Sequence, residues 1–348
     1  MKKPEKIVDL FNDYTVLVNK EVKNLFNRKP GGMYGMMLYF MGFTDEKFRF
    51  KKGIYGGKRF RSALCLFIAD QYGVKIEALP VAVSLEVFHN FTLIHDDIVD
   101  RDELRRGRKT VWKLWGNHHA INSGDGQLIL AILPLAKSDE NFRKNIEPFL
   151  LEQYIKVVEG QYLDFNLSDL PLGDKSITER AYFEMIGKKT SVLVGSALQA
   201  GGMVAGVSKK EERKLFNIGF LLGLTQQLYD DFVSVWGASE TTGKNSYGDI
   251  REKKKTLPVL RAAGVLSKIE KKKLIDIYSS KDSLSDPAVF SVLKILNNTD
   301  AYEYTRKMIE VYKKRALKAV SSISISKEGK SNLVILINAL IPDIKKIA

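Results

Sequence analysis

The stretch HDDIVDRDELRRG, from His95 to Gly107, places four aspartates within seven positions and then two adjacent arginines. On a helix, Asp96 and Asp100 lie one turn apart on the same face, and Asp97 points about 100° away. Carboxylates this close repel one another. Mg²⁺ relieves the repulsion because it prefers oxygen ligands, usually one or two carboxylates with waters and phosphate oxygens. Asp96, Asp97 and Asp100 are therefore candidate magnesium ligands; a solvated acidic helix end is the alternative.

Two cations follow this acidic cluster. Arg105 and Arg106 come within about two helical turns of it. They stand in RRGRKT, which is typical of a helix end that turns into a loop. Guanidinium groups bind diphosphate oxygens through forked hydrogen bonds. The pattern therefore predicts an anionic group, such as a diphosphate, beside the metal.

A second acidic pair, Asp230 and Asp231, lies in QQLYDDFVS, where leucine, tyrosine and phenylalanine surround the polar residues. A solvated face fits this stretch less well than the first. Gln227 lies three residues before Asp230 on the same helical face, and a polar loop with glycines and lysines follows. Asp230 and Asp231 are further candidate metal ligands. Two carboxylate sites, each followed by cations, predict a metal cluster that binds one diphosphate and neutralises a leaving group.

The elements that carry these residues are predicted to be helices. The segment LPVAVSLEVFHNFTLIHDDIVD has apolar residues at helical spacing and begins near Pro80, which suits a first helical turn. Alternating strands bounded by turn residues are missing, and no break is long enough to be a domain linker. We expect a single all-α domain over residues 1–348 with roughly a dozen helices, some of them apolar nearly all round and buried.

The composition narrows the class of protein. The chain has 348 residues, a net charge of +14 and one cysteine, Cys65, so an internal disulfide and a multi-cysteine metal site are excluded. The lysines are scattered and often stand beside glutamates, which favours a lysine-rich surface or an anionic small substrate over nucleic-acid binding. No apolar run reaches the roughly 18 residues of a spanning helix, and no signal-peptide core is present. We expect a cytoplasmic protein without a membrane span.

From GGKRFRS to REKKKTLP, the sequence resembles the trans-prenyl diphosphate synthases, also called polyprenyl synthetases. DDIVDRDELRRG resembles the family's first aspartate-rich motif, DDxxD followed by RRG. QQLYDD, followed by GK and then DIREKKKT, resembles the second. Their order and separation make this combination specific. The resemblance implies a large helical bundle of the isoprenoid synthase type with a central active-site cavity, and a homodimer formed through a helical interface.

The resemblance also implies a role for each matching residue. Asp96 and Asp100 would hold Mg²⁺ on one side and Asp230 on the other, with three ions in each active site. The residues implied to contact the allylic diphosphate are Arg105, Lys189, Thr190, Gln227, Lys244 and Lys254. Those implied to hold the diphosphate of isopentenyl diphosphate are Lys58, Arg61, His89 and Arg106. EGQYLDF matches another segment of the family, which adds Gln161 and Asp164 to the site.

The implied reaction is chain elongation. Mg²⁺ and basic residues draw diphosphate off an allylic substrate (dimethylallyl, geranyl or farnesyl diphosphate), and the double bond of isopentenyl diphosphate attacks the resulting cation. Bulk on the aspartate helix would set the product length. Small Thr92 with large Phe91 resembles the archaeal geranylgeranyl diphosphate synthases, which stop at C20. Phe88, one turn further along, is either a second floor or ordinary core, and farnesyl or longer products are the alternative.

The chain departs from the family pattern at the fifth position of the second motif, which is Ser234 rather than aspartate. This change weakens one metal or water contact. A terpene cyclase is a rival, but it needs glutamate eight residues after Asp230, where this chain has Ala238. It also has no use for an isopentenyl site. A catalytically silent partner subunit is a second rival, expected to have lost site residues that this chain keeps.

Overall fold

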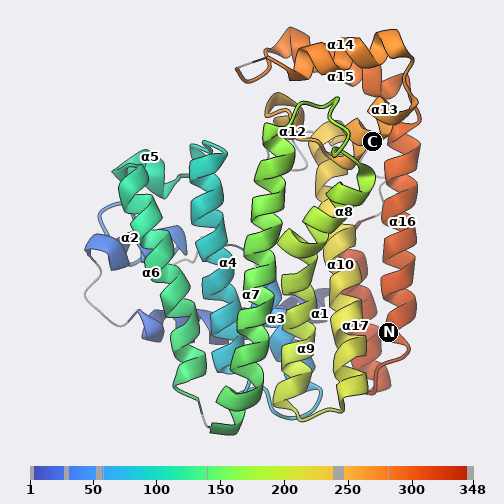
Figure 1. The fold of residues 1–348 in the computed structure, drawn as a ribbon. Helices are drawn as coiled ribbons and strands as arrows, with labels where there is room; N and C mark the ends of the chain where they lie inside the picture. Colours follow the sequence, from blue (N-terminus) through green and yellow to red (C-terminus); the bar gives the residue numbers. More distant parts are fainter. Residues whose placement is uncertain are drawn as a thin grey trace. The chain divides into compact units, whose positions relative to one another are not determined.

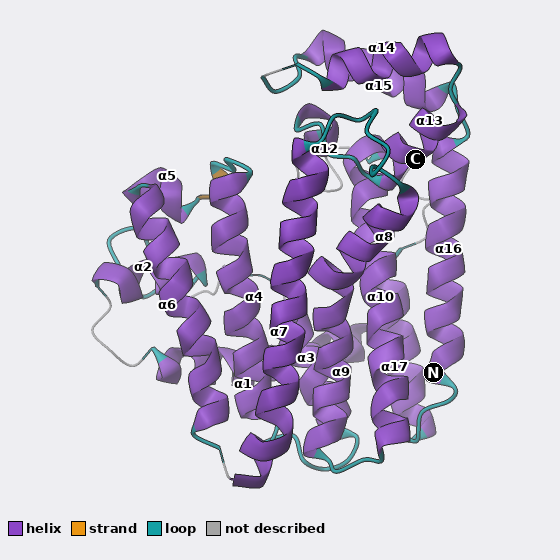
Figure 2. Cartoon of the chain, viewed as in Figure 1, coloured by secondary structure: helices purple, strands orange, loops and turns teal. Residues whose placement is uncertain are grey.

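The structure is a computed structural model that describes residues 4–26, 31–51, 57, 59–138, 140–237, 247–280 and 282–342. Helices make up nearly all of the regular structure in these residues, and one short pair of strands accompanies them (Figure 2). The predicted all-α fold is therefore confirmed. By packing, the chain divides into two units, and the single domain over residues 1–348 stays a prediction.

The first unit consists of Met1–Tyr154 and Ala197–Leu215. Its long helices α4 and α6 pack side by side, and α3 contacts both α1 and α4 (Figure 1). A buried cluster that includes Tyr39, Phe40 and Ile94 joins α2 to α4 and to the start of α6. The elements of this unit are α1 (Pro4–Leu25), α2 (Gly32–Phe40), α3 (Phe60–Asp70), α4 (Leu79–Val99), β1 (Leu104–Arg105), β2 (Arg108–Lys109), α5 (Val111–Trp115) and α6 (Asn117–Ala136).

The second unit consists of Ile155–Ser196 and Phe216–Ala348. In it α13 packs on α16, α16 on α17, and α14 on α15 (Figure 1). The unit contains α8 (Glu179–Ile186), the π-helical segment η1 (Gly187–Ser191), α12 (Gly248–Arg251), α13 (Leu257–Val265), α14 (Lys268–Tyr278), α15 (Asp286–Asn297), α16 (Ala301–Val320) and α17 (Lys327–Leu340). Three helices have residues in both units: α7 (Glu140–Asp169), α9 (Val192–Val204) and α10 (Lys209–Trp236).

Helix α4 carries the first acidic cluster, and its sequence explains its position. Pro80 lies in the first turn, as predicted, where its missing N–H costs no helical hydrogen bond. Most of the helix is buried, including Phe88, Phe91 and Ile94, so it is a central helix of the first unit. The acidic side chains therefore begin where a buried apolar helix ends.

A buried ion pair fixes α4 to the start of α3. Arg59 Nη1 lies 2.8 Å from Glu86 Oε1, and the two side chains are 0% and 3% exposed. Ser62 Oγ donates to Glu86 Oε2 at 2.8 Å, and Asn90 Nδ2 donates to Oε1 at 2.7 Å. The remaining donors of Arg59 bond to Asn19 Oδ1 and to the carbonyl of Met41. The charges are compensated within the core, which is what burial of an ion pair requires.

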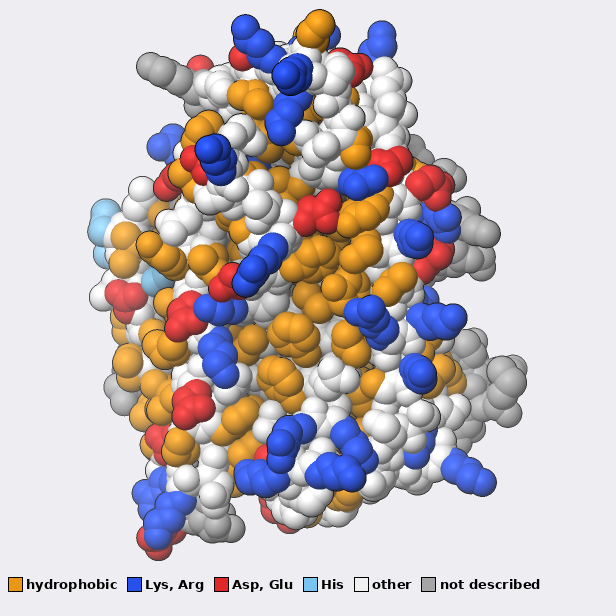
Figure 3. Space-filling model, turned by 45° about the vertical axis from the view of Figure 1, so that its right-hand side comes forward, with side chains coloured by type: hydrophobic (Ala, Val, Ile, Leu, Met, Phe, Trp, Pro, Cys, Tyr) orange, Lys and Arg blue, Asp and Glu red, His pale blue; other side chains and the backbone are white. Residues whose placement is uncertain are grey.

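Several further features concern the chain as a whole. Cys65 is buried in the core, and burial raises the pKa of its thiol. LVILINALI forms part of the packed helix α17, with Leu333, Leu336 and Ile337 buried. Among the described residues, no helix combines the length and the apolar character that crossing a membrane requires. Lysine and arginine side chains are dispersed over the face shown in Figure 3.

Candidate active site

The end of α4 presents the first acidic cluster. Asp96 and Asp97 lie in the last turn of the helix, and Asp100 caps its C-terminus, where its N–H donates to the carbonyl of Asp96 at 2.8 Å. This bond closes one helical turn, so Asp96 and Asp100 lie one above the other, as the sequence predicts. Asp96 and Asp97 are both buried. Three carboxylates thus lie within five residues of a largely desolvated helix end.

Asp97 has a raised pKa. Burial raises its pKa to about 7, against the lowering effect of Arg105. The guanidinium of Arg105 donates to Asp97 Oδ1, whereas Oδ2 is buried and has no hydrogen-bond partner among the described residues. A buried carboxylate oxygen without a donor suits a hard cation, so the cluster fits Mg²⁺. Within the described part of the chain, no three His, Cys, Asp or Glu side chains form a ready cage. Mg²⁺ typically keeps waters and substrate oxygens as its other ligands.

The two arginines that follow stand on a hairpin rather than on the loop that the sequence predicted. β1 and β2 pair antiparallel, with Arg105 opposite Arg108. Arg106 and Gly107 form the two-residue turn, with φ of 55° and 73°. Two consecutive positive φ values define the turn that matches strand twist, and glycine is well suited to the second position. The turn directs Arg105 toward Asp97 and places Arg106 against Gly57.

Arg61, His89 and Arg106 come together in the first unit, as the resemblance implied. Arg61 Nη1 lies 3.0 Å from His89 Nε2. Burial lowers the pKa of His89 well below its ordinary value, and Arg61 and Arg106 lower it further. His89 is therefore neutral, and its Nε2 accepts the hydrogen bond from Arg61. Burial also lowers the pKa of Arg106, to about 10, which leaves it charged at neutral pH. The cluster is a cationic site suited to an anion.

A separate pocket of about 100 Å³ lies within the second unit. Of the predicted site residues, Asp164, Lys189, Thr190, Gln227, Asp231 and Lys254 line it. Gln161, which lies on α7, and Asp230, which is half-buried on α10, do not line it. Lys58 and Lys244 lie outside the described residues. The pocket thus gathers side chains from α7, η1, α10 and the segment after α12.

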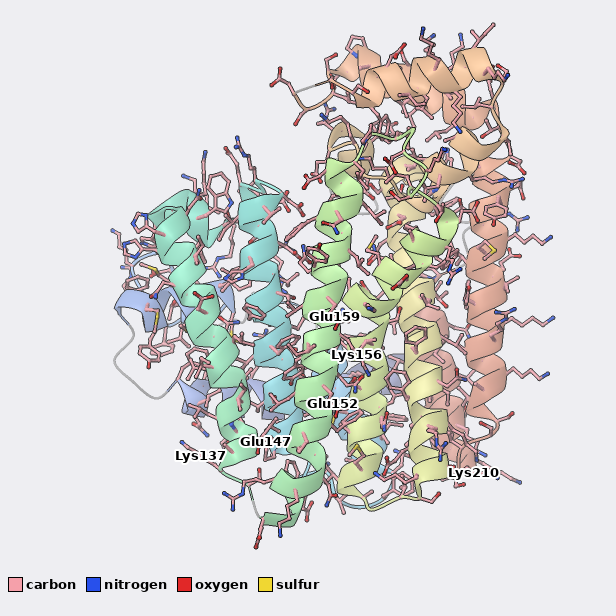
Figure 4. All side chains as sticks on the ribbon, viewed as in Figure 1. Lys137, Glu147, Glu152, Lys156, Glu159 and Lys210 are labelled. Carbon is pink, nitrogen blue, oxygen red and sulfur yellow. The ribbon has the colours of Figure 1, made fainter. Side chains whose placement is uncertain are left out.

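The segment η1 presents Lys189 and Thr190 to this pocket. Lys189 Nζ lies 2.6 Å from Asp164 Oδ2, and Thr190 Oγ1 donates to Gln227 Oε1 at 2.9 Å. The neighbouring Lys188 instead pairs with Glu159 on α7, which is labelled in Figure 4, at 2.9 Å. A π-helical turn shifts the phase of the side chains, and such turns are frequent at functional sites. The sequence did not predict this change within the helix.

Two glycines allow η1 to pack this closely. A Cβ atom on Gly160 of α7 would lie 2.6 Å from Lys189 Cα, and one on Gly223 of α10 would lie 2.6 Å from Ser191 Cα. Both contacts are with backbone, which cannot move aside as a flexible side chain does. Gly160 and Gly223 therefore fix the backbone that carries Lys189 and Thr190.

Asp231 is bonded within the protein rather than open to a ligand. Its Oδ2 accepts from Tyr182 OH at 2.6 Å, and its Oδ1 accepts from Gln227 Nε2 at 2.8 Å. Its metal role stays a prediction, and these bonds favour a role in orienting Gln227. The amide of Gln227 thus donates to Asp231, four residues later in the chain, rather than to Asp230. Burial raises the pKa of Asp231 to about 7, and the charge of Asp249 raises it further.

The raised pKa of Asp231 predicts a pH-dependent stability. Ionising the buried group destabilises the fold, so its contribution is complete below the unfolded pKa near 4 and is lost as pH rises through 7. Relative to Asp231→Asn, the unfolding free energy of the wild-type chain should fall by about 3 kcal/mol between pH 4.5 and 7. Urea unfolding in EDTA measures the difference, and parallel pH profiles would contradict it.

The structure adds Tyr182, Asp249 and Lys255 to the pocket lining. Asp249 and Lys255 belong to DIREKKKT, a segment in which the resemblance implies a role for Lys254 alone. Lys255 Nζ donates to the carbonyl of Ser168 at 2.6 Å, which ties this segment to α7. Tyr182 lies on an amphipathic helix, and its sequence gives no sign of a polar partner.

The predicted chain-length residues lie on α4 in a stack of aromatic rings. The ring centroids of Phe88 and Phe91 lie 5.5 Å apart. Tyr154 stacks on Phe88 at 3.8 Å with an interplanar angle of 4°, and its hydroxyl lies 2.6 Å from Ser84 Oγ. Thr92 is half-buried, and its hydroxyl bonds back to the carbonyl of His89. Tyr154 was not predicted, because it lies 58 residues from Asp96 in sequence.

The chain is similar to known proteins over most of its length. The family described as Polyprenyl synthetase matches residues 50–296. The geranylgeranyl diphosphate synthase of Methanosarcina mazei is 33% identical over 284 residues, covering 81% of this chain and 80% of that protein. The (2E,6E)-farnesyl diphosphate synthase of Mycobacterium bovis is 35% identical over 244 residues, covering 70% and 67%. A crystal structure of geranylgeranyl pyrophosphate synthase aligns with a TM-score of 0.84 and 31% identity, over 98% of this chain and 99% of that one.

Proposed function

Because the chain belongs to the polyprenyl synthetase family, we propose that it condenses isopentenyl diphosphate with an allylic diphosphate and releases diphosphate. The observation that carries the proposal is the cluster of Arg61 and Arg106 around neutral His89. A cyclase, which takes one diphosphate substrate, has no need of a second anion site. The cluster fits the diphosphate of the isopentenyl substrate.

In this reaction the protein's own groups bind and orient the two substrates and shield the cation from water. The C1–O bond of the allylic substrate breaks, and the diphosphate leaves with the electron pair toward Lys189 and Lys254. The double bond of isopentenyl diphosphate then attacks C1, and the carbon next to the new cation gives a proton to the released diphosphate, which restores a double bond. Asp231 fixes the amide of Gln227, which fixes Thr190, so two neutral oxygens are held in place beside the cation.

Asp96, Asp97 and Asp100 are the residues of the first unit that would hold Mg²⁺, and Asp230 is the candidate of the second. Bound Mg²⁺ would supply positive charge that neutralises the departing diphosphate. We assign three ions to each active site. The buried Asp97 oxygen without a donor supports a bound cation at the first acidic cluster.

The experiment that tests the function uses purified protein with labelled isopentenyl diphosphate and, separately, dimethylallyl, geranyl and farnesyl diphosphates. Reactions run with Mg²⁺ or with EDTA, and chromatography separates the products by length. A linear product that disappears in EDTA is expected. Cyclic hydrocarbon from an allylic diphosphate alone would favour a cyclase, and no turnover with any pair would favour a silent partner subunit.

For product length we propose C20, geranylgeranyl diphosphate. The aromatic group formed by Phe91 and Phe88 of the aspartate helix and Tyr154 of α7 supports a floor for the growing tail. The names of the relatives differ in product length, so the support comes from these residues rather than from the family alone.

Phe91→Ala should lengthen the product by at least one five-carbon unit, because it removes the first ring of the floor. Phe88→Ala alone should leave the length unchanged, because Phe91 still closes the path. The double variant should give products longer than either single variant. Chromatography of the chains measures each outcome, and an unchanged distribution from Phe91→Ala would refute the floor.

The active form is proposed to be a cytoplasmic homodimer. Ile155, Val158 and Tyr162 occupy one face of α7 at helical spacing and are exposed, which supports burial against a second copy. Light scattering after size-exclusion chromatography should give twice the chain mass of 39.3 kDa. A monomeric mass at micromolar concentration would argue against the dimer.

A further inference from the structure

Ser234, the residue that departs from the family's second motif, has a defined contact in the structure. Its side chain lies on α10, and its Oγ accepts the backbone N–H of Asp249 at 3.2 Å. Asp249 lies on the short helix α12 and lines the pocket of the second unit. The serine therefore links the helix of the second aspartate pair to a pocket residue.

The link continues from Asp249 to Lys254. The carbonyl of Asp249 accepts the N–H of Lys254 at 2.8 Å, so the N–H and the carbonyl of one residue make the serine contact and the lysine contact. Lys254 lines the same pocket as Thr190 and Gln227. A chain of two hydrogen bonds thus runs from α10 through Asp249 to a cation proposed to bind the allylic diphosphate.

The turn that carries Asp249 and Lys254 needs such support. Tyr247 precedes this turn and Lys253 lies within it, directly before Lys254; their φ values are 65° and 57°, in a region that residues other than glycine rarely adopt. Such residues persist only where surrounding contacts hold them. On the far side, the carbonyl of Arg251 accepts from Leu284 N–H at 3.0 Å, and Arg251 Nη1 donates to the carbonyl of Leu284 at 2.9 Å. Ser234 supplies the contact from α10.

Charge explains why serine suits this position. A carboxylate at residue 234 would lie three and four residues from Asp231 and Asp230, on the same helical face, and beside Asp249. Serine accepts the N–H without adding a further negative charge to this group. The hydroxyl therefore supplies the needed acceptor at lower electrostatic cost.

We propose that Ser234 is a positioning residue that holds Asp249 and Lys254 in place for the allylic diphosphate. In this chain the fifth position of the second motif acts as a hydrogen-bond acceptor for the backbone, not as a ligand of the metal. The inference rests on the proposed prenyl transfer and assigns this role to the one motif position that departs from the family.

The test compares Ser234→Ala with Ser234→Thr and with Ser326→Ala in the full-length protein. Ser326 also accepts a backbone N–H, that of Gly329 at 2.9 Å, at the start of α17, so its loss is a matched control. Ser234→Ala should raise the KM for the allylic diphosphate about fivefold, the size expected for one hydrogen bond. The KM for isopentenyl diphosphate should stay within about twofold, because Arg61 and His89, which contact each other, belong to the other proposed diphosphate site.

Ser234→Thr keeps the hydroxyl and should restore the wild-type allylic KM, whereas Ser326→Ala should leave both KM values unchanged. Hydrogen exchange at the amides of Asp249 and Lys254 gives a readout independent of turnover, and it should accelerate in Ser234→Ala alone. Equal changes in both KM values, or unchanged exchange with an unchanged allylic KM, would overturn the inference. Absence of transfer by the wild-type chain would instead overturn the proposed function.

Discussion

Asp96→Asn should lower kcat by about a thousandfold or more with saturating substrates and Mg²⁺, because electrostatic stabilisation of a leaving group is usually the largest catalytic contribution. Asp96 is buried at the end of α4, one turn from Asp100. Asparagine keeps the shape of the side chain and removes its charge, so the change acts on metal affinity and on charge neutralisation. Initial rates of chain elongation at several Mg²⁺ concentrations measure both effects.

Asp276→Asn provides the matched control, because Asp276 is an exposed aspartate on α14. It should leave kcat within about twofold of the wild-type value, as most surface substitutions away from special features do. Circular dichroism and thermal unfolding should show that both variants fold. Asp96→Asn activity within tenfold of the wild type would show that this carboxylate does not hold an essential metal.

Glu86→Ala should cause the largest loss of stability, about 3–5 kcal/mol of unfolding free energy, because it leaves a buried guanidinium without a counter-charge. Arg59 is 0% exposed and lies 2.8 Å from the Glu86 carboxylate. The alanine also removes the acceptor for Ser62 and Asn90. Urea unfolding at pH 7 measures the change, with thermal unfolding as a second readout.

The Glu86 contribution also has a defined pH dependence. Burial alone would raise the pKa of Glu86, but Arg59, Ser62 and Asn90 hold it below its ordinary value. Ionised Glu86 therefore stabilises the fold above the unfolded pKa, and this contribution is lost as the pH falls through the folded pKa. The difference between wild type and Glu86→Gln should shrink in acid.

Replacing both partners supplies the control. Arg59→Met with Glu86→Leu removes both charges and should recover most of the stability that Glu86→Ala loses, because no buried charge remains unpaired. A double variant no more stable than Glu86→Ala would indicate that lost packing, rather than the unpaired charge, causes the effect.

Much of the site could be predicted because its residues occur in short motifs. Asp96 and Asp100 lie within one helical turn, so their common face follows from helix geometry. Pro80 and the spacing of the apolar residues likewise predict where α4 begins, because both are local features of the sequence. The cluster of Arg61, His89 and Arg106 joins three segments, and only the resemblance to a family brought them together before the structure did.

The remainder depended on backbone conformations and contacts that sequence spacing does not encode. The hairpin at Arg106 needs two consecutive positive φ values, one of them at arginine. The π-helical turn at Lys189 packs closely against Gly160 and Gly223, which come from two other helices. Asp249 enters the pocket through a turn that begins at Tyr247, also with positive φ. Such conformations are uncommon, so a sequence alone favours the ordinary alternatives.

The glycine contact at η1 limits how this protein can be engineered or can evolve. Replacing a helix-interior glycine with alanine is a standard route to higher thermal tolerance, worth about 0.4–1 kcal/mol where the space exists. At residue 160 that route is closed, because the added methyl group would meet the backbone of Lys189. The flexible residue that makes α7 intrinsically weaker is thus the one that lets a lysine reach the pocket. Directed evolution for heat resistance should therefore retain Gly160 and select stabilising substitutions at other positions.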